Sequence, residues 1–203
     1  MDARALRSRA RLHEAVLELA HATPVEQLTA TAVASAAGVH RSTFYEHATS
    51  PDALLRQALL SELDELRADL LVDPRDTVAA VTETTRRVLE HVLRHLEIYR
   101  RGLADDVGAG GLHAMLGDHF LGSSRSLLEQ GRLQLPGGVG GVSDGVVADA
   151  AIRLVALGTV GVIRAWLDEP GPTVADFMAT YAVLVPDWWA HVNHAKDSSS
   201  DPE

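Results

Sequence analysis

The segment AAGVHRSTFYEHA, residues 36–48, gathers side chains that could hold a nucleic acid. An arginine can form a two-pronged contact with guanine, and serine, threonine and tyrosine hydroxyls suit phosphate oxygens. Two small alanines and Gly38 come just before them, and such residues let helices cross closely and turn sharply. The residue types and their spacing therefore predict a helix-turn-helix whose second helix presents a polar side to the DNA major groove.

Two short helices must position these side chains. Thr29 is a good N-cap for a helix over residues 30–37, and Gly38 suits the left-handed position that follows its last turn. The second short helix is expected over 41–47, with Val39 and Phe44 pointing inward. A supporting helix over 3–21 carries a single apolar stripe. The rival interpretation is a packed helical hairpin whose polar face is merely solvated.

Helical periodicity continues along the chain, and no segment shows the alternation of a strand. Ser50 can cap a helix over 51–71 that begins with Pro51. Further helices are expected over 76–95, 97–103, 112–130, 146–168 and 173–192. The predicted fold class is all-α, with a helix-turn-helix DNA-binding domain over 1–48 and a larger body over 49–195. The tail over 196–203 is expected to be disordered.

Charge and composition set limits on the function. The 203 residues carry a net charge of −10, yet residues 1–50 are neutral overall and begin with a basic arm. This distribution is compatible with DNA binding by a small head on an acidic body. The absence of cysteine excludes disulfides and thiolate metal sites. No apolar run approaches 18 residues, so we expect a cytoplasmic protein without a membrane partner.

The segments 9–20 and 28–59 closely resemble the DNA-binding domain of TetR-like and AcrR-like transcriptional regulators. The AAGV…TFY core followed by SPDALL carries the resemblance, which covers about residues 9–60. It implies a homodimer that binds palindromic double-stranded DNA operators and releases them when a small-molecule effector enters the body; we expect a repressor. Carried over residue by residue, the resemblance implies DNA contacts from Thr29, Thr31, Arg41, Ser42, Thr43, Tyr45 and His47.

The two closing helices carry the predicted dimer interface. Both helices are apolar, with small residues that allow close approach and aromatic residues typical of interface cores. An intrachain core alone is the alternative. The predicted interface residues are Val147, Ala151, Leu154, Val155, Gly158, Val162, Phe177, Tyr181, Leu184 and Trp188.

The body carries no motif that names an effector. Apolar and polar side chains on its helices could line a small-molecule cavity, although each could equally be an ordinary core residue. The candidates are Tyr99, Met115, Leu116, His119 and Phe120.

Metal and enzyme chemistry are disfavoured by the sequence. His91 and His95 have a two-ligand helical spacing, but the HExxH glutamate is missing, so solvated histidines are the preferred interpretation and no metal or other cofactor is expected. There is no G-x-S-x-G, P-loop or dinucleotide fingerprint, which argues against an enzyme. Two rivals stay open: a metal-responsive sensor, and a helical dimer whose DNA head has degenerated. His40, Ala48 and Pro51 depart from the family pattern and motivate the second rival.

Overall fold

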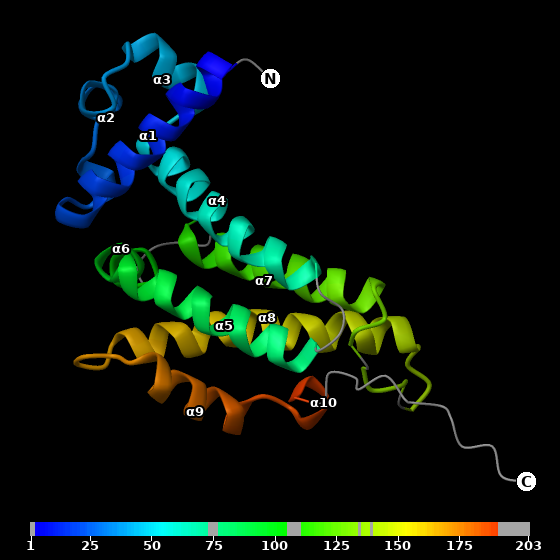
Figure 1. Cartoon of the computed structure of the whole chain (residues 1–203). Helices are drawn as coiled ribbons and strands as arrows, with labels where there is room; N and C mark the ends of the chain where they lie inside the picture. Colours follow the sequence, from blue (N-terminus) through cyan, green and yellow to red (C-terminus); the bar gives the residue numbers. More distant parts are fainter. Residues whose placement is uncertain (1–2, 73–76, 105–110, 134, 139, 191–203) are drawn as a thin grey trace, which may run out of the picture. The chain divides into compact units, whose positions relative to one another are not determined.

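The computed structural model describes residues 3–72, 77–104, 111–133, 135–138 and 140–190 (Figure 1). Within those ranges the regular structure is entirely helical, which confirms the predicted all-α class. The predicted tail over 196–203 lies outside them. The chain forms two compact units. The first unit comprises Met1–Glu65 and His91–Met115, and the second comprises Leu66–Glu90 and Leu116–Glu203. The functional boundary at residues 48 and 49 stays a prediction.

The first unit contains the predicted helix-turn-helix. Helices α1, α2 and α3 pack against one another, and α1 also packs against α6. The unit is completed by the beginning of α4, the end of α5 and the beginning of α7. The bounds are α1 Ala3–Ala22, a 3-10 turn η1 Val25–Gln27, α2 Ala30–Ala36, α3 Arg41–His47, α4 Pro51–Val72, α5 Thr77–Arg94, α6 Leu96–Gly102 and α7 Leu112–Glu129.

Local capping explains why the short helices begin and end where they do. The Thr29 hydroxyl accepts a hydrogen bond from the Ala32 amide at 3.1 Å. Gly38, with φ of 63°, takes the left-handed position after α2. The Ser50 hydroxyl accepts from the Ala53 amide at 3.1 Å, and α4 begins at Pro51. These three predicted caps are confirmed.

A small apolar core fixes the helices of the first unit. Phe44 is fully buried, so α3 is anchored by the side opposite to its polar face. Burial of such a side chain stabilises the fold by roughly 1.5–3 kcal/mol. The other fully buried members of this core include Leu12, Val16, Val33, Leu54 and Leu59.

The second unit holds the rest of α4, α5 and α7, together with α8 Asp144–Leu167, α9 Val174–Leu184 and α10 Asp187–Ala190. The prediction of one closing helix over 173–192 was wrong. Val185 is extended, with ψ of 142°, because the residue before a proline disfavours helical geometry and Pro186 follows. The chain resumes as the short helix α10.

Helix α8 is packed against α9 on one side. The rings of Trp166 and Phe177 meet edge to face at 5.3 Å between centroids. The Trp166 indole donates a hydrogen bond to the Thr173 carbonyl at 3.0 Å, and the Thr173 hydroxyl caps α9. A second buried cluster joins α8 to α7 and to the segment after it, through Leu121, Leu127, Leu133, Ile152 and Ala156.

Helix α8 also corrects an expectation about apolar runs. By length and composition alone it could cross a membrane, since an 18-residue window has a mean hydropathy of 2.0. Its valines, leucines and isoleucines keep the mean high, whereas alanines and glycines among them prevent a continuous run of large apolar residues. Only 33% of that window is buried. The helix therefore leaves apolar surface for something to cover.

Candidate functional site

The outer face of α3 carries most of the side chains predicted to contact DNA. Arg41 and Ser42 are exposed, and Tyr45 is 51% exposed, whereas Phe44 between them is buried. Thr43 and His47 are half-buried, Thr31 is exposed on α2, and Thr29 is exposed at its N-cap. The two helices thus bring the seven predicted residues to the accessible part of the helix-turn-helix. Their contacts with DNA stay a prediction.

Arg41 and Tyr45 are joined on this face. The Arg41 guanidinium donates a hydrogen bond to the Tyr45 hydroxyl at 3.2 Å, across one helical turn. Its carbon also lies 5.4 Å from the centroid of the Tyr45 ring, within the range of a cation–π contact. The pair holds a positive group and a hydroxyl together on the surface, which suits contact with a phosphate or a base edge.

A basic hollow adjoins this face. It has a volume of about 490 Å³ and lies between the first turns of α1 and the segment that forms the turn and α3. Three guanidinium groups of α1 contribute to it, against one carboxylate, that of Glu46. The basic and polar lining residues are Arg4, Arg7, Ser8, Arg11, His40, Thr43 and His47. A polyanion is the partner that such a surface attracts.

The second unit contains a separate cavity of about 100 Å³. Its walls come from α5, α7, α8 and α9, with Arg67 of α4 and Trp189 of α10. Most of the lining is apolar, and hydroxyl groups are placed along it. Those of Thr159 and Tyr181 hydrogen-bond to each other at 2.8 Å, and burial raises the pKa of Tyr181. The remaining hydroxyl-bearing lining residues are Thr84, Thr85, Ser123 and Ser124.

Helices α8 and α9 also present an exposed apolar face. Leu154 is 66% exposed and Val183 is 84% exposed. Gly158 and Gly161 lie on the same face of α8, and nothing lies within 4 Å of a Cβ built on either. A broad groove of about 670 Å³ runs over Gly158, Gly161 and Leu184. Open glycines beside exposed large apolar residues allow another helix to approach closely.

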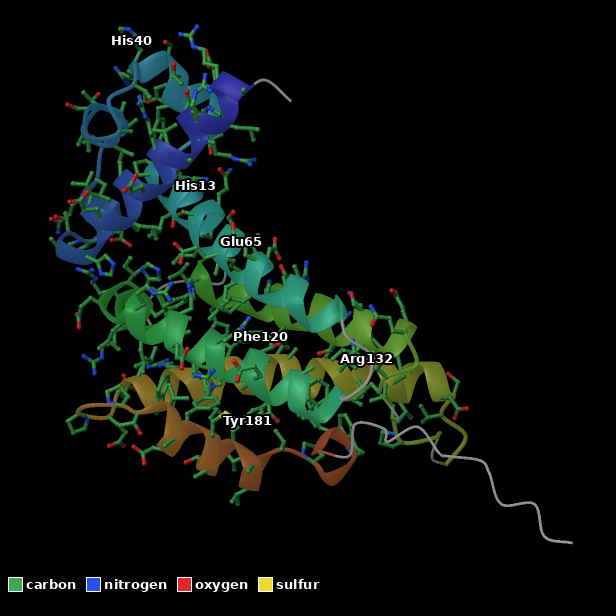
Figure 2. All side chains as sticks on the ribbon, viewed as in Figure 1. His13, His40, Glu65, Phe120, Arg132 and Tyr181 are labelled. Atoms are coloured by element: carbon green, nitrogen blue, oxygen red, sulfur yellow. The ribbon has the colours of Figure 1, made fainter. Side chains whose placement is uncertain are left out.

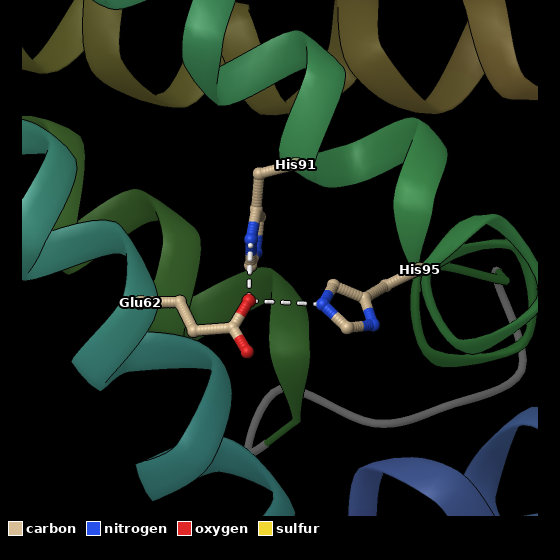
Figure 3. A group of neighbouring side chains, drawn as sticks. All are labelled: Glu62, His91 and His95. Atoms are coloured by element: carbon tan, nitrogen blue, oxygen red, sulfur yellow. Dashed lines mark hydrogen bonds and ion pairs between the residues drawn. The ribbon is translucent and has the colours of Figure 1, made fainter. Parts of the chain in front are cut away.

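A polar cluster in the first unit contradicts the interpretation of His91 and His95 as solvated. Their exposed fractions are 1% and 4%. Both rings face Glu62 of α4, whose Oε2 lies 3.0 Å from His91 Nδ1 and 3.0 Å from His95 Nε2 (Figure 3). The sequence carries a signal for this burial, because His91 and His95 have the same helical spacing as the apolar residues Val88 and Val92. The partner, Glu62, is 29 residues away in sequence and could not be inferred.

The outer nitrogens of both rings are engaged as well. His91 Nε2 lies 2.9 Å from the Tyr99 hydroxyl, and His95 Nδ1 lies 3.2 Å from His21 Nε2. The contact with His91, followed by that with His95, lowers the pKa of Glu62 to about 2, although burial opposes this. Burial lowers the pKa of His95. The carboxylate of Glu62 is thus ionised beside the two rings, and burial favours the neutral form of the His95 ring.

Comparison with known proteins identifies the fold. No family model and no curated protein matches the sequence. Among solved structures, the Thermus thermophilus repressor FadR in complex with lauroyl-CoA superposes with a TM-score of 0.60 at 21% identity, covering 96% of this chain and 100% of its own. A TetR-family regulator from Streptomyces coelicolor gives 0.57 at 21% identity, covering 90% and 83%. The dihydroxyacetone kinase operon activator DhaS gives 0.59 at 10% identity, covering 88% and 96%. The chain has the TetR-type fold.

Within this TetR-type fold, the three departures from the family pattern have local consequences. The side chain of His40 makes no capping bond to α3, as its residue type predicted. Ala48 is only 6% exposed and fills its buried position as a small side chain. Pro51 begins α4, where it fits the first helical turn. None of the three disturbs the bounds of α3 or the exposure of Arg41 and Tyr45.

Only some of the predicted effector residues line the cavity of the second unit. His119 and Phe120 line the cavity of the second unit, as does Tyr181. Figure 2 labels the side chains of Phe120 and Tyr181. Tyr99, Met115 and Leu116 are not among the residues that line it, and their contact with an effector stays a prediction. Tyr99 and Met115 belong to the first unit, and Tyr99 instead contacts His91. Helical periodicity predicts that these residues are buried, but it does not show whether they face the core of the first unit or the cavity of the second.

Only some of the predicted interface residues are accessible on the surface of the single chain. Leu154, Gly158 and Leu184 are exposed on the α8–α9 face, and Val147, Val162, Tyr181 and Trp188 are half-buried. Ala151, Val155 and Phe177 are buried within the single chain, so they belong to the intrachain core. Leu157, Gly161 and Val183 are also exposed on the same two helices, although they were not predicted as interface residues.

Proposed function

We propose that this chain is a homodimeric DNA-binding transcriptional regulator that recognises a palindromic operator through α3 and responds to a small molecule. The observation that carries the proposal is the exposed polar face of α3, with Arg41 and Tyr45 joined on it and Phe44 anchoring the opposite side. A merely solvated hairpin would not need the basic hollow beside that face. Catalysis is not part of the proposal, because TetR-type neighbours are named as regulators.

Electrostatics support DNA as the partner despite the net charge of −10. Three arginines of α1 line the hollow beside α3, whereas the acidic excess lies beyond residue 50. Phosphate contacts supply most of the affinity for DNA, and each one adds about one unit to the slope of log K against log salt. Because Pro51 removes one contact common in the family, we expect a shallow salt dependence.

A second copy of the chain is the proposed cover for the α8–α9 face. A single short helix reads too few base pairs, whereas two heads about 34 Å apart, or a multiple of this, read successive turns of a palindrome. A lipid bilayer is the other solvent that an apolar helix could meet. Arg153 and Arg164 lie on α8, and Asp149 pairs with Arg153 at 2.6 Å, which favours a protein partner in the cytoplasm.

The proposed effector is small and mostly apolar, with one hydrogen-bonding group. Apolar walls and a few hydroxyls are the usual composition of such sites. The cavity of about 100 Å³ is smaller than one known to hold benzene, about 150 Å³, so an effector of aromatic size must widen it. An acyl chain like that of the lauroyl-CoA bound by the Thermus thermophilus protein requires a larger opening still.

The proposal is tested with the DNA that flanks the protein's own gene. We expect a gel shift at low salt, competed poorly by random DNA, and a weaker shift with Arg41→Ala. Arg86→Ala is the matched control, because Arg86 is an exposed arginine of the second unit paired with Glu83 and Glu90. A folded dimer that fails to shift this DNA would favour the degenerate-head alternative. The sign of regulation is read from a reporter, where a repressor lowers transcription.

A further inference from the structure

Three potential metal ligands converge in the first unit. They are one carboxylate oxygen of Glu62, Nδ1 of His91 and Nε2 of His95, and all three atoms lie within 4.8 Å of one another (Figure 3). Glu62 comes from α4, and the two histidines come from the end of α5 and the residue after it. We infer that these three side chains form a binding site for a divalent transition-metal ion, with Zn²⁺ as the best match, that links α4 to α5.

The distances fit a chelate. Zinc binds imidazole nitrogen and carboxylate oxygen at about 2.0–2.2 Å, so two ligands of a tetrahedral ion lie about 3.3 Å apart. Glu62 Oε2 lies 3.0 Å from each histidine nitrogen, which leaves only a small outward movement for an ion to enter. Three protein ligands leave the fourth position of the tetrahedron to water.

The burial of His91 Nδ1 also supports the chelate. His91 Nδ1 is buried and, among the described residues, makes no hydrogen bond, even though a carboxylate oxygen lies 3.0 Å away. Ligands that share an ion direct their lone pairs at the ion and not at one another. A buried ring nitrogen that lies 3.0 Å from a carboxylate oxygen is placed to coordinate an ion that enters between the two.

The surroundings of the histidines match those of metal ligands. A ligating imidazole usually engages its other nitrogen in a hydrogen bond, which fixes the tautomer and the ring orientation. His91 does so with the Tyr99 hydroxyl, and His95 does so with His21 Nε2. When the metal is bound, each histidine donates its remaining N–H outward, so His91 Nε2 donates to Tyr99 and His95 Nδ1 donates to His21.

The ligand set selects the ion. Imidazole suits zinc, copper, iron and nickel, whereas magnesium and calcium prefer a shell made only of oxygen. With one carboxylate and two neutral rings, a divalent ion leaves the site with a single positive charge. Arg94 lies 3.8 Å from the same Glu62 oxygen, and it is 67% exposed, so it can swing into solvent when the ion enters.

The test is metal binding by the full-length, chelator-treated protein, without DNA. We expect one Zn²⁺ per chain in competition with a chromophoric chelator, and a visible absorption band of tetrahedral Co²⁺ at the same stoichiometry. Glu62→Gln and His95→Gln each remove a ligand and should weaken Zn²⁺ binding by at least roughly 100-fold, the upper limit for losing an outer partner. Tyr99→Phe removes only an outer partner and should weaken it roughly 10-fold. Arg94→Ala, which removes a competing cation, should bind at least as tightly as the unchanged protein.

His113→Gln is the matched control, since His113 is an exposed histidine of the same unit. It should bind Zn²⁺ like the unchanged protein. Circular dichroism shows whether each variant is folded, and Glu62→Gln is the most secure because its side chain is 34% exposed. Less than one Zn²⁺ per chain, or equal affinity in folded Glu62→Gln, overturns the metal site. Neither result bears on the proposed function, whose own test is the DNA shift.

Discussion

Arg41 donates a hydrogen bond to the hydroxyl of Tyr45 at 3.2 Å on the exposed face of α3. Residues four apart on a helix are neighbours, so this pair is positioned before any DNA arrives. The side chain of Arg41 would otherwise lose much of its freedom on binding. The pair therefore lowers the entropy that recognition costs and couples the two side chains.

The first prediction concerns that coupling. Tyr45→Phe removes the hydroxyl and should weaken binding to all DNA sequences, whereas Arg41→Ala should also relax discrimination between operator and random DNA. Because the residues are in contact, the two losses should not add, and the double variant should fall short of their sum by about 0.5–3 kcal/mol. Fluorescence anisotropy with operator and random duplexes measures all four proteins. Strictly additive losses, or equal losses on both duplexes for Arg41→Ala, would reject the assigned roles.

The second prediction concerns the α8–α9 face. Leu154→Asp places a charge at a residue that is 66% exposed in the single chain, so the folded chain should tolerate it while the dimer dissociates. Val142→Asp is the control, because Val142 is 48% exposed but lies before α8. Sedimentation velocity gives the two masses. A Leu154→Asp protein that stays dimeric would place the interface elsewhere.

The third prediction uses the open glycine of the same face. Gly158→Ala should favour the isolated helix by roughly 0.5–1 kcal/mol, since alanine has the better helix propensity and a Cβ meets nothing within 4 Å. At a close helix–helix contact the added methyl group should nevertheless weaken the dimer. The dimer dissociation constant should rise although the helix is favoured. A tighter dimer would mean that no helix approaches Gly158.

The fourth prediction concerns the cavity. Ser123→Phe puts a ring at a lining residue whose hydroxyl donates to the His119 carbonyl of its own helix, so the hydrogen bond that is lost is local. The variant should bind operator normally but resist release by the effector. Ser126→Phe, on the same helix but outside that lining, is the control. Binding of phenol, followed by the melting temperature, offers a first probe. Equal responses in both variants would move the effector site out of this cavity.

The fifth prediction concerns acid stability through His13. Burial lowers its pKa below 6.5, with Arg9 and His47 acting in the same direction and Glu62 opposing them. The unfolded chain then binds more protons below pH 6.5, so His13 favours the folded state above that pH and this contribution is lost as the pH falls. With a chelator present, the melting temperature should fall less between pH 7.5 and 5.5 for His13→Gln than for the unchanged protein. An identical loss would assign the acid sensitivity to other groups.

Sequence reasoning was most successful where structure is local. The bounds of α3 and the caps at Thr29, Gly38 and Ser50 follow from residue types within a few positions, and all agree with the structure. The predicted end of the helix that contains α9 was wrong, although Pro186 is a local signal for an earlier end.

Long-range packing was the part that sequence reasoning missed. The contact between Glu62 and His95 joins residues 33 positions apart, and no local rule brings them together. The sequence also does not show that Tyr99 packs in the first unit and Phe120 lines the cavity of the second, because both residues lie in segments with the same helical periodicity. The sequence also does not distinguish residues buried within the chain from residues of a dimer interface. Val155 and Leu154 are neighbours on one apolar helix, yet Val155 is buried and Leu154 is exposed.

The central claim is that two copies of α3 enter successive major grooves of one duplex. Hydroxyl-radical footprinting on the DNA that flanks the gene tests it most directly. We predict two symmetric protected segments whose centres lie about 34 Å apart, or a multiple of that, on one face of the duplex, both lost with Arg41→Ala. A single protected segment, or a symmetric pair that survives in that variant, would contradict the account.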